Sequence, residues 1–162
     1  MNKNKISNSL RGKRSRAAGR RFEAKVRGDL EKLGWIVDKW TNTIDYDKNG
    51  KIGKIVPAKR KWNPFKKVMV IGTGFPDFIC FRNIEKEETI EGIPLPEKYV
   101  NKSNKFEVIG VEVKSVGYLN QKEKGMCFWL LKNRVFSRIL IARKRKEGRR
   151  IKVEYKEFNK NL

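Results

Sequence analysis

Two short segments of the sequence combine acidic and basic residues with apolar neighbours in a way that suits metal-dependent chemistry. One segment, Gly74–Phe81, carries Asp77 in front of a continuous apolar run, and the other, Val111–Ser115, carries Glu112 and Lys114. Side chains alternate between the two faces of a strand, so the acid and the lysine share one face and the valines face the core. If the two strands pair, both carboxylates converge on one hard cation, Mg²⁺ or Mn²⁺.

A divalent cation at this position would neutralise a phosphate and activate a water molecule. Lys114 is then the candidate to orient or deprotonate that water, and Val113, between the two charged residues, is a further candidate metal ligand. A simpler interpretation stays open, in which Glu112 and Lys114 form a cross-strand ion pair at the edge of a sheet.

The residue types that are missing narrow the chemistry further. The sequence has no histidine and two cysteines, Cys80 and Cys127, which form no Cys-x-x-Cys pair. A zinc site is therefore not expected, and mechanisms that depend on Ser-His-Asp or Cys-His are excluded. Each cysteine sits in an apolar run, which indicates a buried free thiol and a reducing, cytoplasmic location.

The charge balance points to a polyanionic partner. The 162 residues include 40 Lys and Arg against 18 Asp and Glu, a net charge of +22. Nucleic acid is the first partner to consider and an anionic membrane surface the second. No apolar run is long enough to span a bilayer and no secretion signal is expected. The candidate nucleic-acid contacts are Arg16, Arg20, Arg21, Lys59, Arg60, Lys61, Arg143, Lys144 and Arg145.

The first element that the pattern predicts is a helix over residues 16–33, preceded by a flexible basic arm over residues 1–15. Apolar residues recur at helical spacing and Gly34 follows as a stop. Beside the apolar stripe, Glu23 lies among three arginines of the same helix. Either these side chains form ion pairs on a solvated face, or Glu23 stands at the edge of an anionic site.

The remaining elements predict an α/β fold, a mixed central β-sheet flanked by helices, in one domain over residues 16–162. The expected strands are 35–40, 68–71, 77–82, 106–115, 136–142 and 151–158, with a buried helix over 119–132. Inserts are expected at about 41–71 and 83–106, and a basic hairpin tip at 143–152. Residues 54–67 mix basic and aromatic residues, which suits either contact with nucleic acid or packing on the core.

These features together resemble the PD-(D/E)xK nuclease superfamily, with Pro76-Asp77 followed by Glu112-Val113-Lys114. Arg16–Glu23, Gly34–Val37 and Glu112–Ser115 are similar to archaeal Holliday junction resolvases, and Gly74–Phe78 and Gly117–Glu123 to virus-type replication-repair nucleases. The spacing between Asp77 and Glu112 is wider than in the compact resolvases, which the inserts explain.

The resemblance implies a restriction-endonuclease-like core and a role for each site residue. Asp77 and Glu112 would bind metal, Lys114 would serve the attacking water, and Glu23 would be an outer metal or water ligand. Such nucleases often have a glutamine in the following helix, where Gln121 is the candidate, although Glu123 could align instead.

The leading hypothesis is therefore a Mg²⁺-dependent endodeoxyribonuclease, with Mn²⁺ able to substitute, that cuts branched DNA in repair or recombination. The resemblance to Holliday junction resolvases also implies a homodimer. Two alternatives remain: a restriction-like or single-strand nuclease, and a nucleic-acid-binding module on the same fold without catalysis.

Overall fold

The computed structural model describes residues 8–46, 52–59, 61–63, 67–70, 74–83 and 106–159. The main elements in chain order are α1 (Asn8–Lys32), β1 (Ile36–Lys39), β6 (Phe78–Asn83), β7 (Phe106–Val113), α2 (Gln121–Lys132), β8 (Arg138–Glu147) and β9 (Arg150–Glu157). Four short strands between β1 and β6 form two hairpins: β2 (Asn42–Tyr46) with β3 (Ile52–Pro57), and β4 (Lys61–Asn63) with β5 (Val68–Val70).

One five-stranded sheet organises these elements, in the order β1-β6-β7-β8-β9. Strands β7 and β8 are parallel and are connected through α2, while the other neighbours are antiparallel. In the β6–β7 ladder Phe78 lies opposite Val111. The residues just outside this pair are Asp77 and Glu112, so the expected pairing of the two site segments is confirmed.

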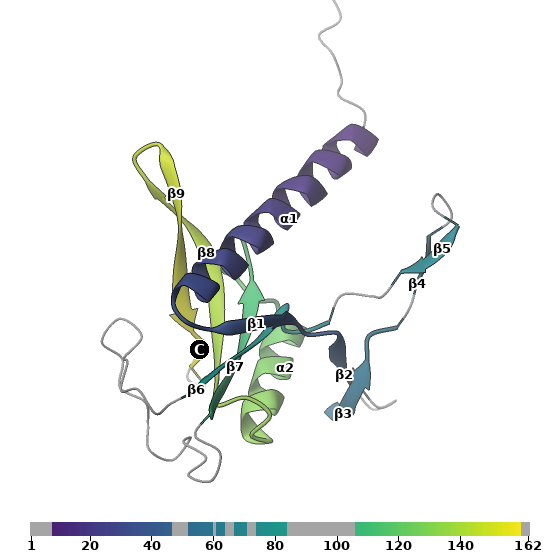
Figure 1. Ribbon diagram of the computed structural model, residues 1–162. Helices are drawn as coiled ribbons and strands as arrows, with labels where there is room; N and C mark the ends of the chain where they lie inside the picture. The colour runs from purple at the N-terminus through teal and green to yellow at the C-terminus, as the bar shows by residue number, and fades with distance from the viewer. Residues whose placement is uncertain are drawn as a thin grey trace, which may run out of the picture.

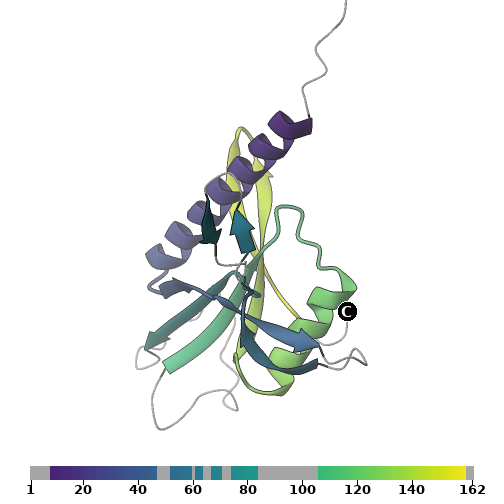
Figure 2. The ribbon, with the colours of Figure 1, turned by 90° about the vertical axis from the view of Figure 1, so that its right-hand side faces the viewer.

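The two helices cover opposite faces of the sheet (Figures 1 and 2). Helix α1 buries Phe22, Val26 and Leu30 in a cluster with alternate residues of the strands. Helix α2 buries Met126, Cys127 and Leu130 in a second cluster. Since each strand sends alternate side chains to each cluster, the mixed α/β class predicted from the sequence is confirmed.

Helix α1 begins at Asn8, eight residues earlier than the pattern predicts. Residues 8–15 are therefore helical and do not belong to a flexible arm, and residues 1–7 lie outside the described residues. The apolar stripe is confined to the C-terminal half of the helix, which is why periodicity alone gave a later start. The N-terminal half extends past the sheet (Figure 1).

Three other expectations need correction or lie outside the description. The insert expected at 41–71 contains two hairpins. The strand expected at 68–71 is β5, whereas β2, β3 and β4 were not predicted, because strands of three to six residues leave little pattern. Helix α2 is not buried all round, since Phe128 on its outer face is 45% exposed. Residues 84–105, most of the second expected insert, lie outside the described residues.

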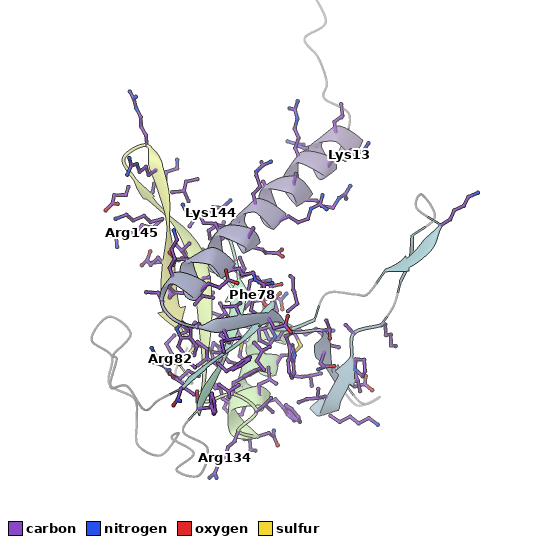
Figure 3. The ribbon with its side chains drawn as sticks, in the orientation of Figure 1. Lys13, Phe78, Arg82, Arg134, Lys144 and Arg145 are labelled. Carbon is purple, nitrogen blue, oxygen red and sulfur yellow. The ribbon has the colours of Figure 1, made fainter. Side chains whose placement is uncertain are left out.

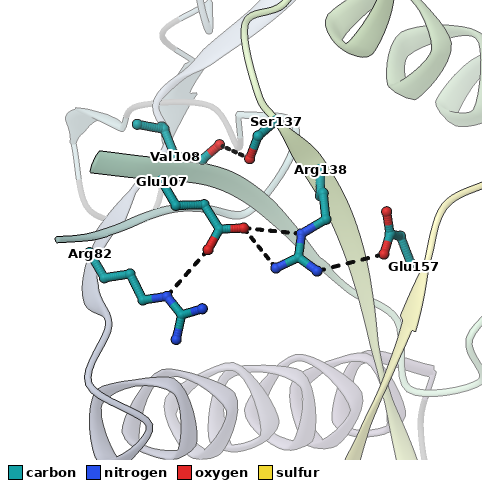
Figure 4. Close-up of polar contacts among 6 residues, drawn as sticks. All are labelled: Arg82, Glu107, Val108, Ser137, Arg138 and Glu157. Carbon is teal, nitrogen blue, oxygen red and sulfur yellow. Dashed lines mark hydrogen bonds and ion pairs between the residues drawn. The ribbon is translucent and has the colours of Figure 1, made fainter. Parts of the chain in front are cut away.

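A cluster of charged residues around the buried Glu107 and Arg138 joins β6, β7, β8 and β9 (Figure 4). Glu107 lies at the opposite end of β7 from Glu112. Glu107 on β7 is 2% exposed and accepts hydrogen bonds from Arg82 at 3.2 Å and from Arg138 Nη2 at 2.7 Å. Arg138 is itself 3% exposed and also lies 3.8 Å from Glu157. Opposite charges that share hydrogen bonds make this burial tolerable.

Candidate active site

The turn before β6 fixes the position of Asp77 by close backbone packing. A methyl group at Gly74 would lie 1.9 Å from the Trp40 carbonyl oxygen, so only glycine fits there. The Phe75 N–H donates to the Asn42 carbonyl at 2.9 Å, and the bond between Phe75 and Pro76 is cis. The close packing at Gly74 and the hydrogen bond of Phe75 hold the chain directly before Asp77, next to the β6–β7 ladder.

Asp77 and Glu112 hold each other through the backbone of the neighbouring strand. The Val113 N–H donates to Asp77 Oδ2 at 2.9 Å, and the Asp77 N–H donates to Glu112 Oε2 at 3.1 Å. Glu112 is 5% exposed. These reciprocal hydrogen bonds bring two carboxylates side by side where β7 ends and β6 begins.

Lys114 is held between two carboxylates. Its ammonium lies 3.1 Å from Glu112 Oε1 and 2.6 Å from Glu123 Oε1. Strand β7 is the central strand of the sheet, so the ion pair of Glu112 and Lys114 does not lie at a sheet edge as the simpler interpretation supposed. The lysine instead links β7 to the first turn of α2.

Burial is the main cause of the raised pKa values of Asp77 and Glu112. Desolvation, reinforced by the charge of Asp77 and opposed by Lys114, raises the pKa of Glu112 from 4.5 to about 8. Desolvation also raises the pKa of Asp77, and the charge of Glu23 adds to the increase while the Val113 hydrogen bond opposes it. A cation near these oxygens would relieve the cost of ionising them.

The state of Lys114 follows from its two partners. Desolvation lowers its pKa, but the hydrogen bonds and charges of Glu123 and Glu112 together outweigh this and the pKa is raised. The side chain is therefore a protonated ammonium at neutral pH. In this arrangement Lys114 can orient a water molecule or stabilise negative charge, but it cannot take a proton.

Glu23 reaches the edge of the same site from α1. Its Oε2 lies 2.8 Å from the ammonium of Lys39, the last residue of β1. Lys39 also lies 5.0 Å from the centroid of the Phe78 ring, beside Asp77. Arg27, one of the arginines of the helical stripe, pairs with Glu31 at 2.9 Å instead. The interpretation in which Glu23 lies at the edge of the site is the one that these contacts favour.

The residue of α2 that reaches the site is Glu123 and not Gln121. Gln121 is exposed at the first position of the helix, whereas Glu123 Oε1 lies 2.6 Å from the ammonium of Lys114. Residues two apart in a helix point roughly 200° apart, so only one of the two can face Lys114. Glu123 Oε2 also accepts the Asn120 N–H at 2.9 Å in a capping box, and this Asn-x-x-Glu spacing was the available sequence signal.

Two adjacent carboxylates are the donors that a metal could use here. Among the described residues, no group of three or more Asp, Glu, Cys and His side chains could hold a metal ion. Mg²⁺ commonly uses one or two carboxylates and keeps several waters or phosphate oxygens, so the donor set of Asp77 and Glu112 fits it. Val113 supplies its N–H to Asp77, which leaves its carbonyl as the only group it could offer.

The basic side chains predicted to contact nucleic acid differ in their exposure and in their partners. Arg16, Arg20 and Arg21 are exposed on α1, and Lys59 is exposed after β3. Arg143 pairs with Glu154 at 2.8 Å, and Lys144 lies 5.0 Å from the centroid of the Phe22 ring. Arg145 is exposed on the hairpin, whereas Arg60 and the side chains of Lys61 and Trp62 lie outside the described residues. Lys13 on α1 and Arg145 on β8 both project from the parts of these elements that extend beyond the end of β7 (Figure 3).

Replacing Glu123 by glutamine is expected to lower the pKa of Lys114. Glutamine can keep the helix cap, but it removes the charge that lies 2.6 Å from the lysine ammonium. The pKa can be followed by NMR of the lysine side-chain resonances across the alkaline range, with Glu31→Gln on α1 as the control. A pKa of Lys114 that does not move would contradict the contact between Lys114 and Glu123.

Comparison with known proteins finds no matching family model, no curated protein and no solved structure with significant similarity. No helix among the described residues is long and apolar enough to cross a membrane.

Proposed function

We propose that this protein is a metal-dependent endonuclease that hydrolyses phosphodiester bonds in DNA, with branched DNA as the preferred substrate. One observation carries the proposal: Asp77, Glu112, Lys114 and Glu123 form one connected group at the junction of β6, β7 and α2. A sheet with a helix on each face, and paired acids where β6 begins and the central strand β7 ends, is also consistent with the restriction-endonuclease-like core that the sequence resemblance implies.

Each residue of this group has a distinct task in the proposed reaction. When Mg²⁺ or Mn²⁺ is bound, it supplies positive charge to the phosphate and acidity to a water molecule. Asp77 and Glu112 provide the carboxylate oxygens that would hold it. Lys114 remains cationic and stabilises negative charge on the attacked phosphate or orients the water, while Glu123 fixes the lysine side chain. Glu23, which is paired with Lys39, would serve as an outer ligand of the metal or its water.

The distribution of charge supports DNA as the substrate. The N-terminal half of α1 and the β8–β9 hairpin both extend beyond the end of β7 (Figures 1 and 2). Six basic residues and no acid lie between Asn8 and Phe22, and their side chains are exposed. Two basic arms beside one acidic site can hold phosphates on both sides of the cut.

The competing proposal is a nucleic-acid-binding module without catalysis. The net charge of +22 favours it, because a basic surface binds nucleic acid whether or not the acids hold a metal. The buried contact between Glu112 and Lys114 and the raised pKa of Glu112 favour the nuclease, because a binding module has no need of a buried acid with a perturbed pKa in a central strand.

A cleavage assay on a panel of labelled DNAs separates the two proposals. Four-way junction, flap, splayed duplex, single strand and linear duplex are incubated with Mg²⁺, Mn²⁺ or EDTA, using the wild type and Asp77→Asn. We expect cutting of the branched substrates that requires metal and disappears in the variant, while binding in EDTA is retained. Binding without cutting in every metal would support the binding module, and preferential cutting of single strands or linear duplex would support the alternative nucleases.

A further inference from the structure

The two most exposed of the large apolar side chains in the described structure lie together, directly after the catalytic candidate Lys114. Tyr118 is 79% exposed and Val116 is 70% exposed, in the loop that joins β7 to α2. Neither side chain belongs to one of the two core clusters. Large apolar groups that the fold leaves in solvent beside a reactive site suit contact with a ligand.

The loop has a defined shape that presents these side chains. The Gly117 N–H donates to the Lys114 carbonyl at 2.8 Å, and Gly117 adopts a left-handed φ of 77°. A methyl group at Gly117 would lie 2.7 Å from Arg143 Cδ, so the loop backbone rests directly on β8. Figure 2 shows the loop running beside the β8–β9 hairpin before it enters α2.

The Arg143 side chain, on which the loop rests, is held in place by hydrogen bonds. Arg143 donates two hydrogen bonds to Glu154, at 3.2 Å from Nε and 2.8 Å from Nη2. The Lys144 N–H donates to the Ser115 carbonyl at 3.4 Å. The aromatic ring of Tyr118 is therefore carried by a braced turn, so little conformational freedom is lost when a ligand contacts it.

We propose that the Val116–Tyr118 loop receives an unstacked base of the DNA strand that is held at the acidic site. This inference rests on the proposed function, because it names the substrate feature that the same site would recognise. An exposed aromatic ring beside basic residues offers a nucleotide both stacking and charge, and stacking does not depend on base identity. Bases are free to unstack at branch points and in single strands, whereas they are paired and stacked inside a linear duplex.

The consequence is a preference for DNA with an unpaired base next to the cleaved phosphate. The ring of Tyr118 provides the stacking surface and Val116 an apolar flank. Phosphates on either side would be held by the exposed basic residues of α1 and the hairpin, which make no distinction between paired and unpaired strands.

The test measures binding and base stacking in EDTA, in the Asp77→Asn background, so that no cleavage is required. A splayed DNA carries 2-aminopurine next to its junction, and a linear duplex carries it at the same position of the sequence. Tyr118→Ala and Tyr118→Phe are compared with the background protein. Phe106→Ala is the control, because Phe106 is an exposed aromatic residue at the opposite end of β7.

Tyr118→Ala is expected to weaken binding of the splayed DNA roughly tenfold and to abolish the change in 2-aminopurine fluorescence. Binding of the duplex should change less than about twofold, and Tyr118→Phe and Phe106→Ala should behave as the background protein does. Equal binding of splayed DNA by Tyr118→Ala, or an equal loss on both DNAs, would overturn the proposal. Failure of the proposed function has a different signature, since it is the absence of metal-dependent cutting by the wild type.

Discussion

Glu112→Gln is expected to reduce metal-dependent cleavage by about a hundredfold or more while leaving DNA binding in EDTA intact. Glutamine has nearly the same shape, but it removes one of the two adjacent carboxylates and leaves Lys114 paired with Glu123 alone. Single-turnover cleavage of the best substrate of the panel measures the effect. Glu31→Gln, which changes an exposed pair on α1, is the matched control and should cut at the wild-type rate.

The same variant has a second readout that does not depend on activity. Burial raises the pKa of Glu112 in the folded protein to about 8 from its ordinary 4.5. The folded state therefore binds this proton more tightly than the unfolded state. The contribution of Glu112 to the free energy of unfolding is lost as the pH rises from about 4.5 to about 8. Glu112→Gln has no such proton, so its stability should fall less over that window, by a difference on the order of a few kcal/mol.

Urea unfolding in EDTA at several pH values between 5 and 9 measures this difference. If the free energy of unfolding changed with pH equally for the wild type and Glu112→Gln, the pKa of Glu112 would not be raised in the folded protein. A cleavage rate close to that of the wild type would remove Glu112 from the reaction. The two results are independent, so a structural role and a catalytic role can be told apart.

The second large effect is expected from Glu107, at the opposite end of β7. Glu107→Gln should lower the free energy of unfolding by about 3–5 kcal/mol, because it leaves buried arginine charge without its carboxylate. Arg138, which is 3% exposed, loses a carboxylate that is 2.7 Å from its Nη2, and Arg82 loses one at 3.2 Å. Urea unfolding followed by tryptophan fluorescence at constant pH gives the value.

The control for Glu107 is a pair of the same chemistry on the surface. Glu147 and Lys152 form an ion pair across the β8–β9 hairpin, and both side chains are more than half exposed. Glu147→Gln should change the free energy of unfolding by less than about 1 kcal/mol. Similar losses for the two variants would mean that the buried cluster contributes no more than an exposed ion pair.

Much of the fold could be predicted because its signals are local. The apolar runs of β6 and of the C-terminal half of α1 mark buried elements, and Gly34 marks the end of the helix with a φ of 83°. The two cysteines are free and buried, as their apolar surroundings indicated. Strand β5 (Val68–Val70) was predicted at 68–71, but β2, β3 and β4 were not, because these strands of three to six residues have too few apolar positions for a usable periodicity.

For the candidate site too, some features could be predicted from local sequence and others required the tertiary structure. Alternation along one strand was enough to place Glu112 and Lys114 on one face and to suggest that Asp77 would meet them. The choice between Gln121 and Glu123 needed the direction in which α2 leaves the loop, which depends on the packing of Met126 and Leu130 on the sheet. The protonation state of Lys114 likewise depends on two partners, Glu112 and Glu123, which belong to different elements.

By itself the sequence narrowed the candidate chemistry to carboxylates, lysine and a hard cation, and its net charge predicted a polyanion as partner. It also determined the strand faces and the central α/β order, because alternation and helical spacing are properties of neighbouring residues. Only the tertiary structure decided that Glu23 pairs with Lys39, that Arg143 pairs with Glu154, and that Tyr118 is exposed in the loop after Lys114. Such pairings depend on distances between elements far apart in the chain, and spacing in the sequence does not encode those distances.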